Sequence, residues 1–292
     1  WLERLGVATF DQFNDGDAIL EGYAPTLTRQ RLPRQDGMVR MIGGPSALIE
    51  ALADRIGFAN IRVSAKAVEV SEQGKQHTRV LLSTGELLPA QRVIIAVPLR
   101  VAATSLRLPW ASRALISAMR ATPTWMSTHA KAVALYNRPF WRDAGLSGKI
   151  ASRLGPLVEV HDHSGIDGTP AALFGFVGWP PEQRVSDPEG LKKAILGQLS
   201  ACFGNEAAHP LELIIQDWAT KPDIMTKQDL SQPTDHPEVG PAVLRQSHLE
   251  GRVRFAVSEG SHVSPGLIEG ALAIGEQVAL HLIDEASHGW GT

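Results

Sequence analysis

Apolar residues recur at two spacings along the chain, and each spacing predicts a kind of element. Helical spacing, with apolar residues three and four positions apart, predicts helices in four segments: 43–57, 111–121, 188–204 and 266–282. Alternation or a short apolar run predicts strands in others: 60–73, 77–90, 92–98, 130–141, 149–155, 156–164, 171–179 and 211–219. A further short strand begins at Arg254, just before the last helix.

The order of these elements predicts a mixed α/β (α+β) chain. A helix-strand-hairpin-strand run covers 43–98, and an antiparallel meander follows from 130 to 179. Residues 26–40 are polar and basic without periodicity, so a loop is expected there. Residues 220–245 are rich in Pro, Asp and Thr and predict a second, long loop, which is uncommon unless it is functional or disordered.

Composition narrows the class of protein. The 292 residues are 43% hydrophobic, enough for one large domain or two of ordinary size. The net charge of −3 contains no block of one sign, which argues against nucleic-acid binding. No apolar run approaches the roughly 20 residues of a membrane span, and no signal peptide is apparent. We therefore expect no membrane partner and a cytoplasmic location.

Two groups of metal-binding residue types are weak candidates for chemistry. Cys202 is the single cysteine and lies in an apolar helical segment, which predicts a buried, inert thiol and excludes an internal disulfide. His161 and His163 flank Asp162, but residues two apart on a strand share a face without supplying a third ligand. A metal site is not expected.

Lys131 is a stronger candidate because it interrupts an apolar strand, AKAVAL. A lysine there must reach water, a partner or a cavity, since burying a lone ammonium group is costly. One interpretation is an edge-strand lysine facing solvent, and the other is a lysine aimed into a pocket. Trp218 ends another strand and is either core or a wall against a planar ligand.

The C-terminal stretch RFAVSEGSHVSPGLIEGALAIGEQVALHL joins a short strand to a helix through small residues. A turn of this kind needs small residues for structural reasons alone. The alternative is that the helix start meets a ligand carrying negative charge, because the first N–H groups of a helix lack intrahelical partners.

Several motifs occur in an order that resembles a known family. They are VRMIGGPSALIEALADRIG, NIRVSAKAVEV followed by RVIIAVP, AKAVALYNRPFW, QDW, and GRVRFAVSEGSHVSPGLIEGALAIGE. Together they span roughly residues 40–285, and they are similar to segments of the flavin-containing amine oxidases, the monoamine and polyamine oxidases.

The resemblance implies a fold and a division of the chain. The fold would be an FAD/NAD(P)-binding-like domain interleaved with a substrate domain of antiparallel sheet and helices. Residues 1–40 would be an N-terminal remnant, 41–105 and 216–292 parts of the FAD-binding domain, and 106–215 the substrate domain.

The resemblance also implies site residues and an activity. Lys131, eight residues before Pro139-Phe140-Trp141, would hold a water near flavin N5, and Trp218 would wall the ring. The residues implied to contact FAD are Gly43, Gly44, Ala67, Val68, Ala96, Val97, Pro98, Ser258, Glu259, Gly266, Leu267 and Ile268. The activity would be oxidation of a small amine to an imine, with O2 reduced to hydrogen peroxide.

The chain departs from the family pattern at defined points. No G-x-G-x-x-G fingerprint follows a strand, Val257 replaces a glycine, and Leu267 replaces an aromatic residue. One hypothesis is therefore a truncated amine oxidase that acts on a small-molecule amine. A second is a non-catalytic remnant or split half that needs a complementing N-terminal segment to bind FAD, and a homodimer is also open. A third is a related flavin desaturase or protoporphyrinogen-type oxidase.

Overall fold

The computed structural model describes residues 1–33, 37–74, 77–232 and 237–287. These residues form two compact units, each made of two stretches of chain. Unit 1 comprises Trp1–Arg62 and His129–Asp217, and unit 2 comprises Val63–Thr128 and Trp218–Thr292. The four-segment division expected from the family resemblance stays a prediction.

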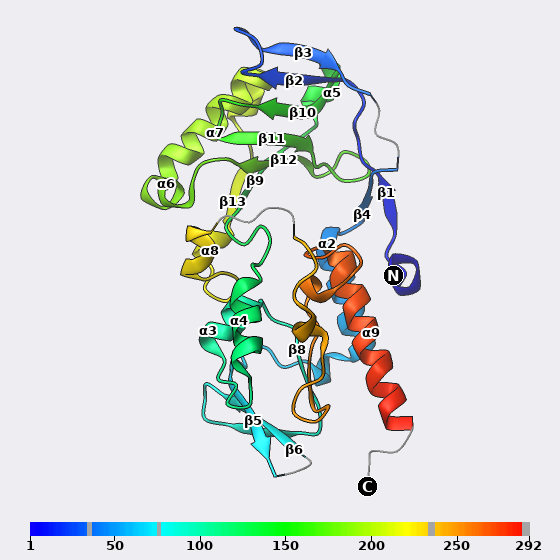
Figure 1. Cartoon of the computed structure of the whole chain (residues 1–292). Coiled ribbons are helices and arrows are strands. Elements are labelled where there is room, and N and C mark those ends of the chain that lie inside the picture. Colours follow the sequence, from blue (N-terminus) through cyan, green and yellow to red (C-terminus); the bar gives the residue numbers. More distant parts are fainter. Residues whose placement is uncertain (34–36, 75–76, 233–236, 288–292) are drawn as a thin grey trace. The chain divides into compact units, whose positions relative to one another are not determined.

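A seven-stranded sheet forms the centre of unit 1 (Figure 1). Neighbouring strands are antiparallel except for one parallel pair, β10 with β2. The strands in spatial order are β13 (Glu212–Asp217), β9 (Ala130–Tyr136), β12 (Ala171–Val177), β11 (Leu157–Asp162), β10 (Leu146–Ser152), β2 (Asp17–Glu21) and β3 (Thr28–Arg31).

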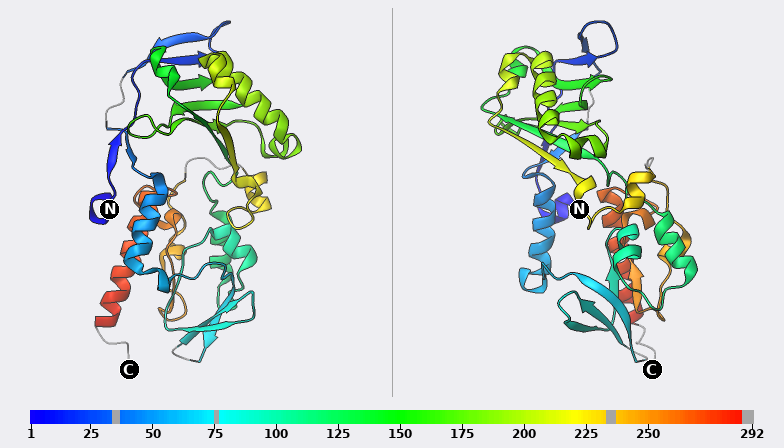
Figure 2. Two further views of the ribbon diagram at one scale, coloured as in Figure 1. Left: turned by 180° about the vertical axis from the view of Figure 1, so that it is seen from behind. Right: turned by 90° about the vertical axis from the view of Figure 1, so that its left-hand side faces the viewer.

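Helix α7 (Pro188–Phe203) packs along one face of this sheet, which we call the helix face (Figure 2). The helix begins where the Asp187 side chain accepts a hydrogen bond from the Gly190 N–H and Pro188 occupies the first turn. Its apolar side buries Leu191, Ile195 and Leu199 against the sheet. The short elements α5 (Phe140–Asp143), α6 (Pro181–Ser186) and η2 (Asn205–Ala208) complete this layer.

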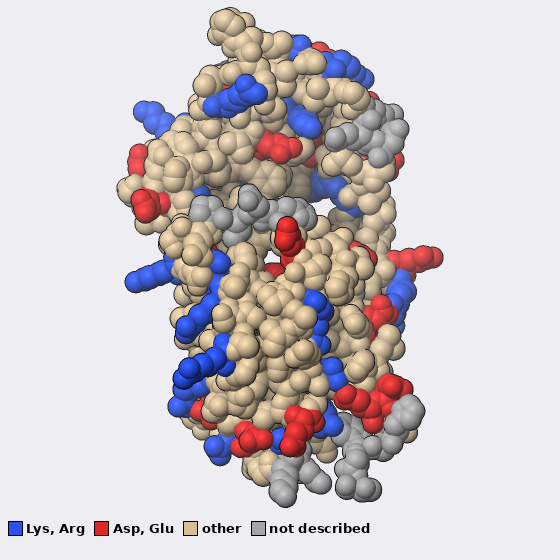
Figure 3. All heavy atoms as spheres, viewed as in Figure 1, with Lys and Arg blue, Asp and Glu red and all other residues tan. Residues whose placement is uncertain are grey.

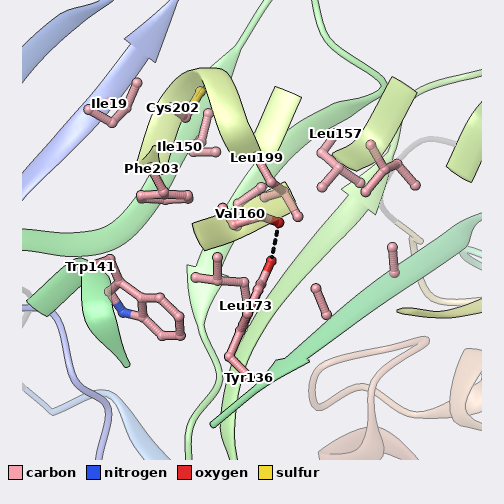
Figure 4. Packing of buried hydrophobic residues seen from close by; sticks show 14 of the residues in the cluster. Ile19, Tyr136, Trp141, Ile150, Leu157, Val160, Leu173, Leu199, Cys202 and Phe203 are labelled. Atoms are coloured by element: carbon pink, nitrogen blue, oxygen red, sulfur yellow. Dashed lines mark hydrogen bonds between the residues drawn. The ribbon is translucent and has the colours of Figure 1, made fainter. Parts of the chain in front are cut away.

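The alternation along β9 decides which side chains enter the core. Ala130, Ala132, Ala134 and Tyr136 are buried in the helix-face core, whereas the residues between them are half-buried. Figure 4 shows Tyr136 within this core, together with Trp141 and Phe203. The Tyr136 hydroxyl donates a hydrogen bond of 2.9 Å to the Ala207 carbonyl, so the buried phenol is satisfied. We call the opposite side of the sheet the second face.

Two segments complete unit 1. The short strands β1 (Thr9–Asp11) and β4 (Val39–Met41) pair antiparallel. The other elements are helical: α1 (Leu2–Leu5), α2 (Gly44–Ile56) and η1 (Phe58–Asn60).

Unit 2 contains two small sheets. Strands β5 (Ala67–Gln73), β6 (His77–Leu82) and β7 (Leu87–Ala90) form an antiparallel sheet. Strands β8 (Val93–Ile95) and β14 (Val253–Phe255) pair in parallel. Its helical elements are α3 (Leu99–Ser105), α4 (Arg113–Ala121), η3 (Trp218–Thr220), α8 (Lys227–Ser231), η4 (Ala242–Arg245), η5 (Ser258–Gly260) and α9 (Ile268–Ser287). Its core gathers residues from α3, α4, β8 and β14.

Most predicted elements occur in the structure, and several predictions were wrong. The strand expected over 130–141 ends at Tyr136, and Phe140 begins α5. Residues 26–40 include part of β4 and the whole of β3, and the polar, mostly exposed residues of β3 gave no apolar alternation. Residues 220–245 contain α8 and η4; Thr226 and Asp229 form a capping box at α8, and Asp229 pairs with buried Arg100. The strand expected over 60–73 begins only at Ala67. The buried strand expected over 92–98 is three residues long, and Ile94 within it is 46% exposed.

Three structural features bear on the expectations drawn from composition. In the view of Figure 3, basic and acidic side chains are interspersed. Within the described residues, no helix is long and apolar enough to cross a bilayer. Cys202 is buried as predicted, and burial raises the pKa of its thiol to about 12.

Candidate active site

Lys131 occupies the second face of the unit 1 sheet, near the start of β9. The antiparallel register places it directly opposite Phe176 on β12 and opposite Gln216 on β13. Its ammonium nitrogen lies 5.4 Å from the ring centroid of Phe176 and 5.6 Å from that of Phe174. The two rings pack edge to face with their centroids 5.0 Å apart, so the ammonium group lies over a pair of adjoining phenyl rings, a contact that favours a cation near an aromatic face.

The interpretation of Lys131 as an edge-strand residue was wrong. Strand β9 pairs on both sides, with β13 and with β12, so Lys131 is in the interior of the sheet. Burial lowers the pKa of its ammonium group. Burial also lowers the pKa of neighbouring His129, with further contributions from Arg184 and Lys131. This part of the second face thus disfavours additional positive charge.

The parallel strands of unit 2 bring two predicted cofactor segments side by side. Strand β8 pairs with β14 in the register Ile95 to Phe255, and the Ala256 N–H donates to the Ile95 carbonyl. The segments that follow, Ala96-Val97-Pro98 and 256–259, therefore leave the sheet from the same edge. Ligands of α/β sheets bind beyond the carboxyl ends of parallel strands.

Helix α9 begins after a left-handed glycine. Gly266 has φ +76°, and a Cβ there would lie 2.3 Å from Cγ of Pro237, so both conformation and space require glycine. Two apolar residues follow, Leu267 and Ile268, which are 37% and 53% exposed. The start of α9 thus combines unpaired N–H groups with exposed apolar side chains, as a planar anionic ligand would need.

Glu259 tests whether this edge fits a cofactor with hydroxyl groups. Glu259 is 7% exposed. Among the described residues, its carboxylate accepts one hydrogen bond, from the Ser258 hydroxyl at 3.0 Å. A buried carboxylate normally accepts several hydrogen bonds or pairs with a cation. The spare acceptor capacity of Glu259 fits a ligand that donates hydroxyl groups, such as the ribityl chain of FAD.

The remaining predicted site residues are divided between the units. Gly43 and Gly44 belong to unit 1, where both adopt positive φ at the start of α2. Ala67 and Val68 are half-buried at the start of β5, in a different sheet from β8 and β14. Trp218 is half-buried and opens η3 in unit 2.

The sequence interpretation missed Phe174 and Phe176. They are two apart in the strand segment AALFGFVGW, so they share a face, but only the register shows that this face also carries Lys131. The weak metal candidate also has another explanation. His161 contacts Glu159 at 2.8 Å, and Asp162 is buried against Trp141 and Arg142. No group of three potential ligands is arranged to hold a metal in the part of the chain that the structure describes.

Comparison with known proteins identifies the family. The family model described as flavin containing amine oxidoreductase matches residues 18–283. The chain belongs to this family. It is 25% identical over 84% of its length to the Dictyostelium discoideum protein named "Probable flavin-containing monoamine oxidase A", and 26% identical over 84% to amine oxidase B of Bos taurus. These matches cover 53% and 47% of the relatives, so the chain spans about half of their length.

Solved structures agree with the expected mixed α/β, amine-oxidase-like fold. A putrescine oxidase bound to putrescine superposes with a TM-score of 0.78 over 97% of this chain and 84% of that one, at 17% identity. Cyclohexylamine oxidase from Brevibacterium oxydans gives a TM-score of 0.78 over 98% and 84%, at 16% identity. At these identities the likeness concerns the fold alone.

Proposed function

We propose that this chain is the part of an FAD-dependent amine oxidase that carries the lysine of the active site and the C-terminal part of the flavin site. The observation that carries the proposal is Lys131, which lies over the adjoining rings of Phe174 and Phe176 in the interior of the sheet with a pKa lowered by burial. The family is flavin-containing, and the edge formed by β8 and β14 offers residues that fit a flavin.

The residues proposed to hold FAD have separate roles. Glu259 would accept hydrogen bonds from the ribityl or ribose hydroxyls, and Ser258 keeps its carboxylate in place. The first N–H groups of α9 would favour a negatively charged ring edge, and Leu267 and Ile268 would contact its apolar part. Trp218 is proposed as a wall against the ring. The flavin would supply the two-electron oxidation of a small-molecule amine.

Lys131 is proposed to act through a water molecule. Its ammonium group would donate a hydrogen bond to this water and keep it near the reacting atoms, while the two phenyl rings exclude bulk solvent from its stem. The fixed positive charge would stabilise negative charge that develops when O2 is reduced to hydrogen peroxide. The lowered pKa would let the same group release or take up a proton more readily than an exposed lysine.

Flavin reduction and reoxidation test this proposal. The protein is saturated with FAD, and the flavin absorbance is followed first with amine under anaerobic conditions and then after O2 is added. Lys131→Met is expected to slow reoxidation by a factor on the order of 10² while flavin binding is unchanged. Lys192→Met, on the exposed surface of α7, is the control. Bound flavin that no amine reduces would contradict amine oxidation and favour the related desaturases.

A second candidate function is that of a half protein that needs a complementing N-terminal segment to bind FAD. Parallel sheets usually have several strands and two covered faces, whereas β8 and β14 form a pair in which Ile94 is 46% exposed and nearby Val97 46%. Mixing the chain with a segment that contains a Gly-rich dinucleotide-binding unit should then produce flavin binding. Tight FAD binding by the chain alone would contradict this candidate.

A homodimer and a cytoplasmic location are also proposed. The exposed apolar residues of β8 and of the segment after it offer a surface to a second copy of the chain. Light scattering after gel filtration measures the mass, and a monomer at micromolar concentration would contradict the dimer. Cell fractionation checks the location.

A further inference from the structure

A pocket lies at the second face of the unit 1 sheet, beside strands β10 and β11. The pocket has a volume of about 210 Å³ and lies entirely within unit 1. Its polar lining includes Gln12, Asn14, Lys149 and His161, and its apolar lining includes Phe13 and Met38. Such a size suits a small organic molecule rather than a single ion.

The sheet register aims Lys149 and His161 at the same side. Strands β10 and β11 pair Ile150 with Val160, and both of these residues are buried in the helix-face core. Side chains alternate along a strand, so Lys149 and His161 project from the second face. Extending the register by one residue places them opposite each other.

Lys149 is the lining residue whose positive charge no described residue neutralises. It is half-buried, and no described residue forms an ion pair or a side-chain hydrogen bond with its ammonium group. The acidic groups nearby have other partners. Asp162 accepts from Trp141 and Arg142 at 2.8 Å and from the Ser164 N–H at 2.9 Å.

A second acidic side chain near the pocket, Glu159, is also engaged. Glu159 lies 2.8 Å from the His161 ring nitrogen. Among the described lining residues this leaves one cation without a counter-charge, in a half-buried position where such a charge is costly. An anionic group on a ligand would remove that cost.

Hydrogen bonds and a cation–π contact hold the lining of the pocket in place. The Gln12 N–H donates to the Met38 carbonyl at 2.8 Å, and its side-chain amide donates to the Asp162 carbonyl at 2.6 Å. The Phe13 ring stacks 3.9 Å from the Arg142 guanidinium carbon. A site held in place before binding loses little entropy when a ligand enters.

We propose that this pocket binds a small carboxylic acid with a compact apolar body, whose carboxylate pairs with Lys149 and whose body contacts Phe13 and Met38. The binding measurement needs neither bound flavin nor turnover of an amine. Its failure is therefore distinguishable from failure of the proposed function, which is measured by flavin reduction and reoxidation.

Three probes of similar shape and different charge test the proposal. Isothermal titration calorimetry of the full chain compares phenylacetate, phenethylamine and 2-phenylethanol. Phenylacetate is expected to bind at least about tenfold more tightly than the other two, since a charged hydrogen bond contributes about 1.5–3 kcal/mol. Equal affinity for the amine, or no binding of phenylacetate, would overturn the proposal.

Variants of Lys149 locate the site. Lys149→Met is expected to weaken phenylacetate binding at least about tenfold, whereas Lys149→Arg keeps the charge and retains binding. Lys192→Met on α7 is the control, because its ammonium group pairs with Glu189 on an exposed surface. Circular dichroism verifies that each variant is folded. Unchanged binding by folded Lys149→Met would place the carboxylate elsewhere and refute the assignment.

Discussion

The two faces of the unit 1 sheet are formed by the same strands but carry different kinds of side chain. On β9 the helix face receives alanines and one tyrosine, and the second face receives Lys131, Val133 and Leu135. The alanines are at most 2% exposed and belong to the same hydrophobic core as the apolar residues of α7. Small residues let a helix approach a sheet closely, so this face is specialised for packing.

The second face accepts groups that the helix face could not. A lysine with a lowered pKa and a lysine for which no described residue supplies a counter-charge would destabilise a closed core. They are tolerated where a ligand or water can reach them. Neighbouring residues of one strand therefore have different roles: one packs in the core, and the next presents a group to a ligand or water on the opposite face.

A lysine introduced on the helix face should lower the stability more than any other change considered. Ala132→Lys would place an ammonium group in the helix-face core, where Ala132 is 2% exposed, and is expected to cost at least about 5 kcal/mol. Val133→Lys, on the second face, should cost about 1 kcal/mol. Urea denaturation followed by circular dichroism measures both. Similar costs for the two variants would refute the distinction between the faces.

A cavity in the helix face should have the next largest effect. Trp141 is fully buried, with T-shaped contacts to Tyr136 and Phe140 and a hydrogen bond to Asp162. Trp141→Ala is expected to lower the free energy of unfolding by about 3–5 kcal/mol. The half-buried Phe176→Ala on the second face should lose less. If the second-face variant lost as much, that face would also be a packed core.

The sequence was informative where period and local chemistry decide structure. Helical spacing after Gly43-Gly44-Pro45 predicted α2 within one residue at each end, and alternation around Lys131 predicted the start of β9, although not its end. The strand-turn-helix pattern likewise predicted β14 and α9. In each case the residues that determine the element are close in sequence, so a pattern suffices.

Long-range pairing was beyond reach of the pattern. Strand β13 pairs with β9 across more than seventy residues, and this pairing alone removes Lys131 from an edge. The pocket beside Lys149 joins residues 12–14 to β10 and β11, again through contacts that no local signal encodes. The polar strand β3 has no apolar alternation because it lies at the sheet edge.

A single hydrogen bond on the helix face should have a smaller effect. Tyr136→Phe keeps the ring and removes the hydroxyl that donates to the Ala207 carbonyl. The expected loss is about 1 kcal/mol, because the buried carbonyl is left without this donor. Thermal and urea unfolding measure it, with Tyr23→Phe on the exposed surface as control. No loss would mean that water replaces the hydroxyl in this core.

The smallest effect on stability is expected at Lys131, and its dependence on pH carries the information. Burial lowers the folded-state pKa below the ordinary value of 10.5, so the unfolded chain holds the proton more tightly than the folded chain. The charge therefore costs stability below the lowered pKa, and this cost disappears as the pH rises towards 10.5.

Lys131→Met removes that cost together with the contacts to Phe174 and Phe176, which oppose it. We expect a net change within about 1 kcal/mol at neutral pH. The stability of the variant relative to the parent should then decline as the pH rises, because only the parent gains from losing the proton. Urea midpoints at several alkaline pH values measure this slope. If the stabilities of parent and variant changed in parallel with pH, Lys131 would be solvated like a surface lysine. Its charge would then not be shielded on the second face.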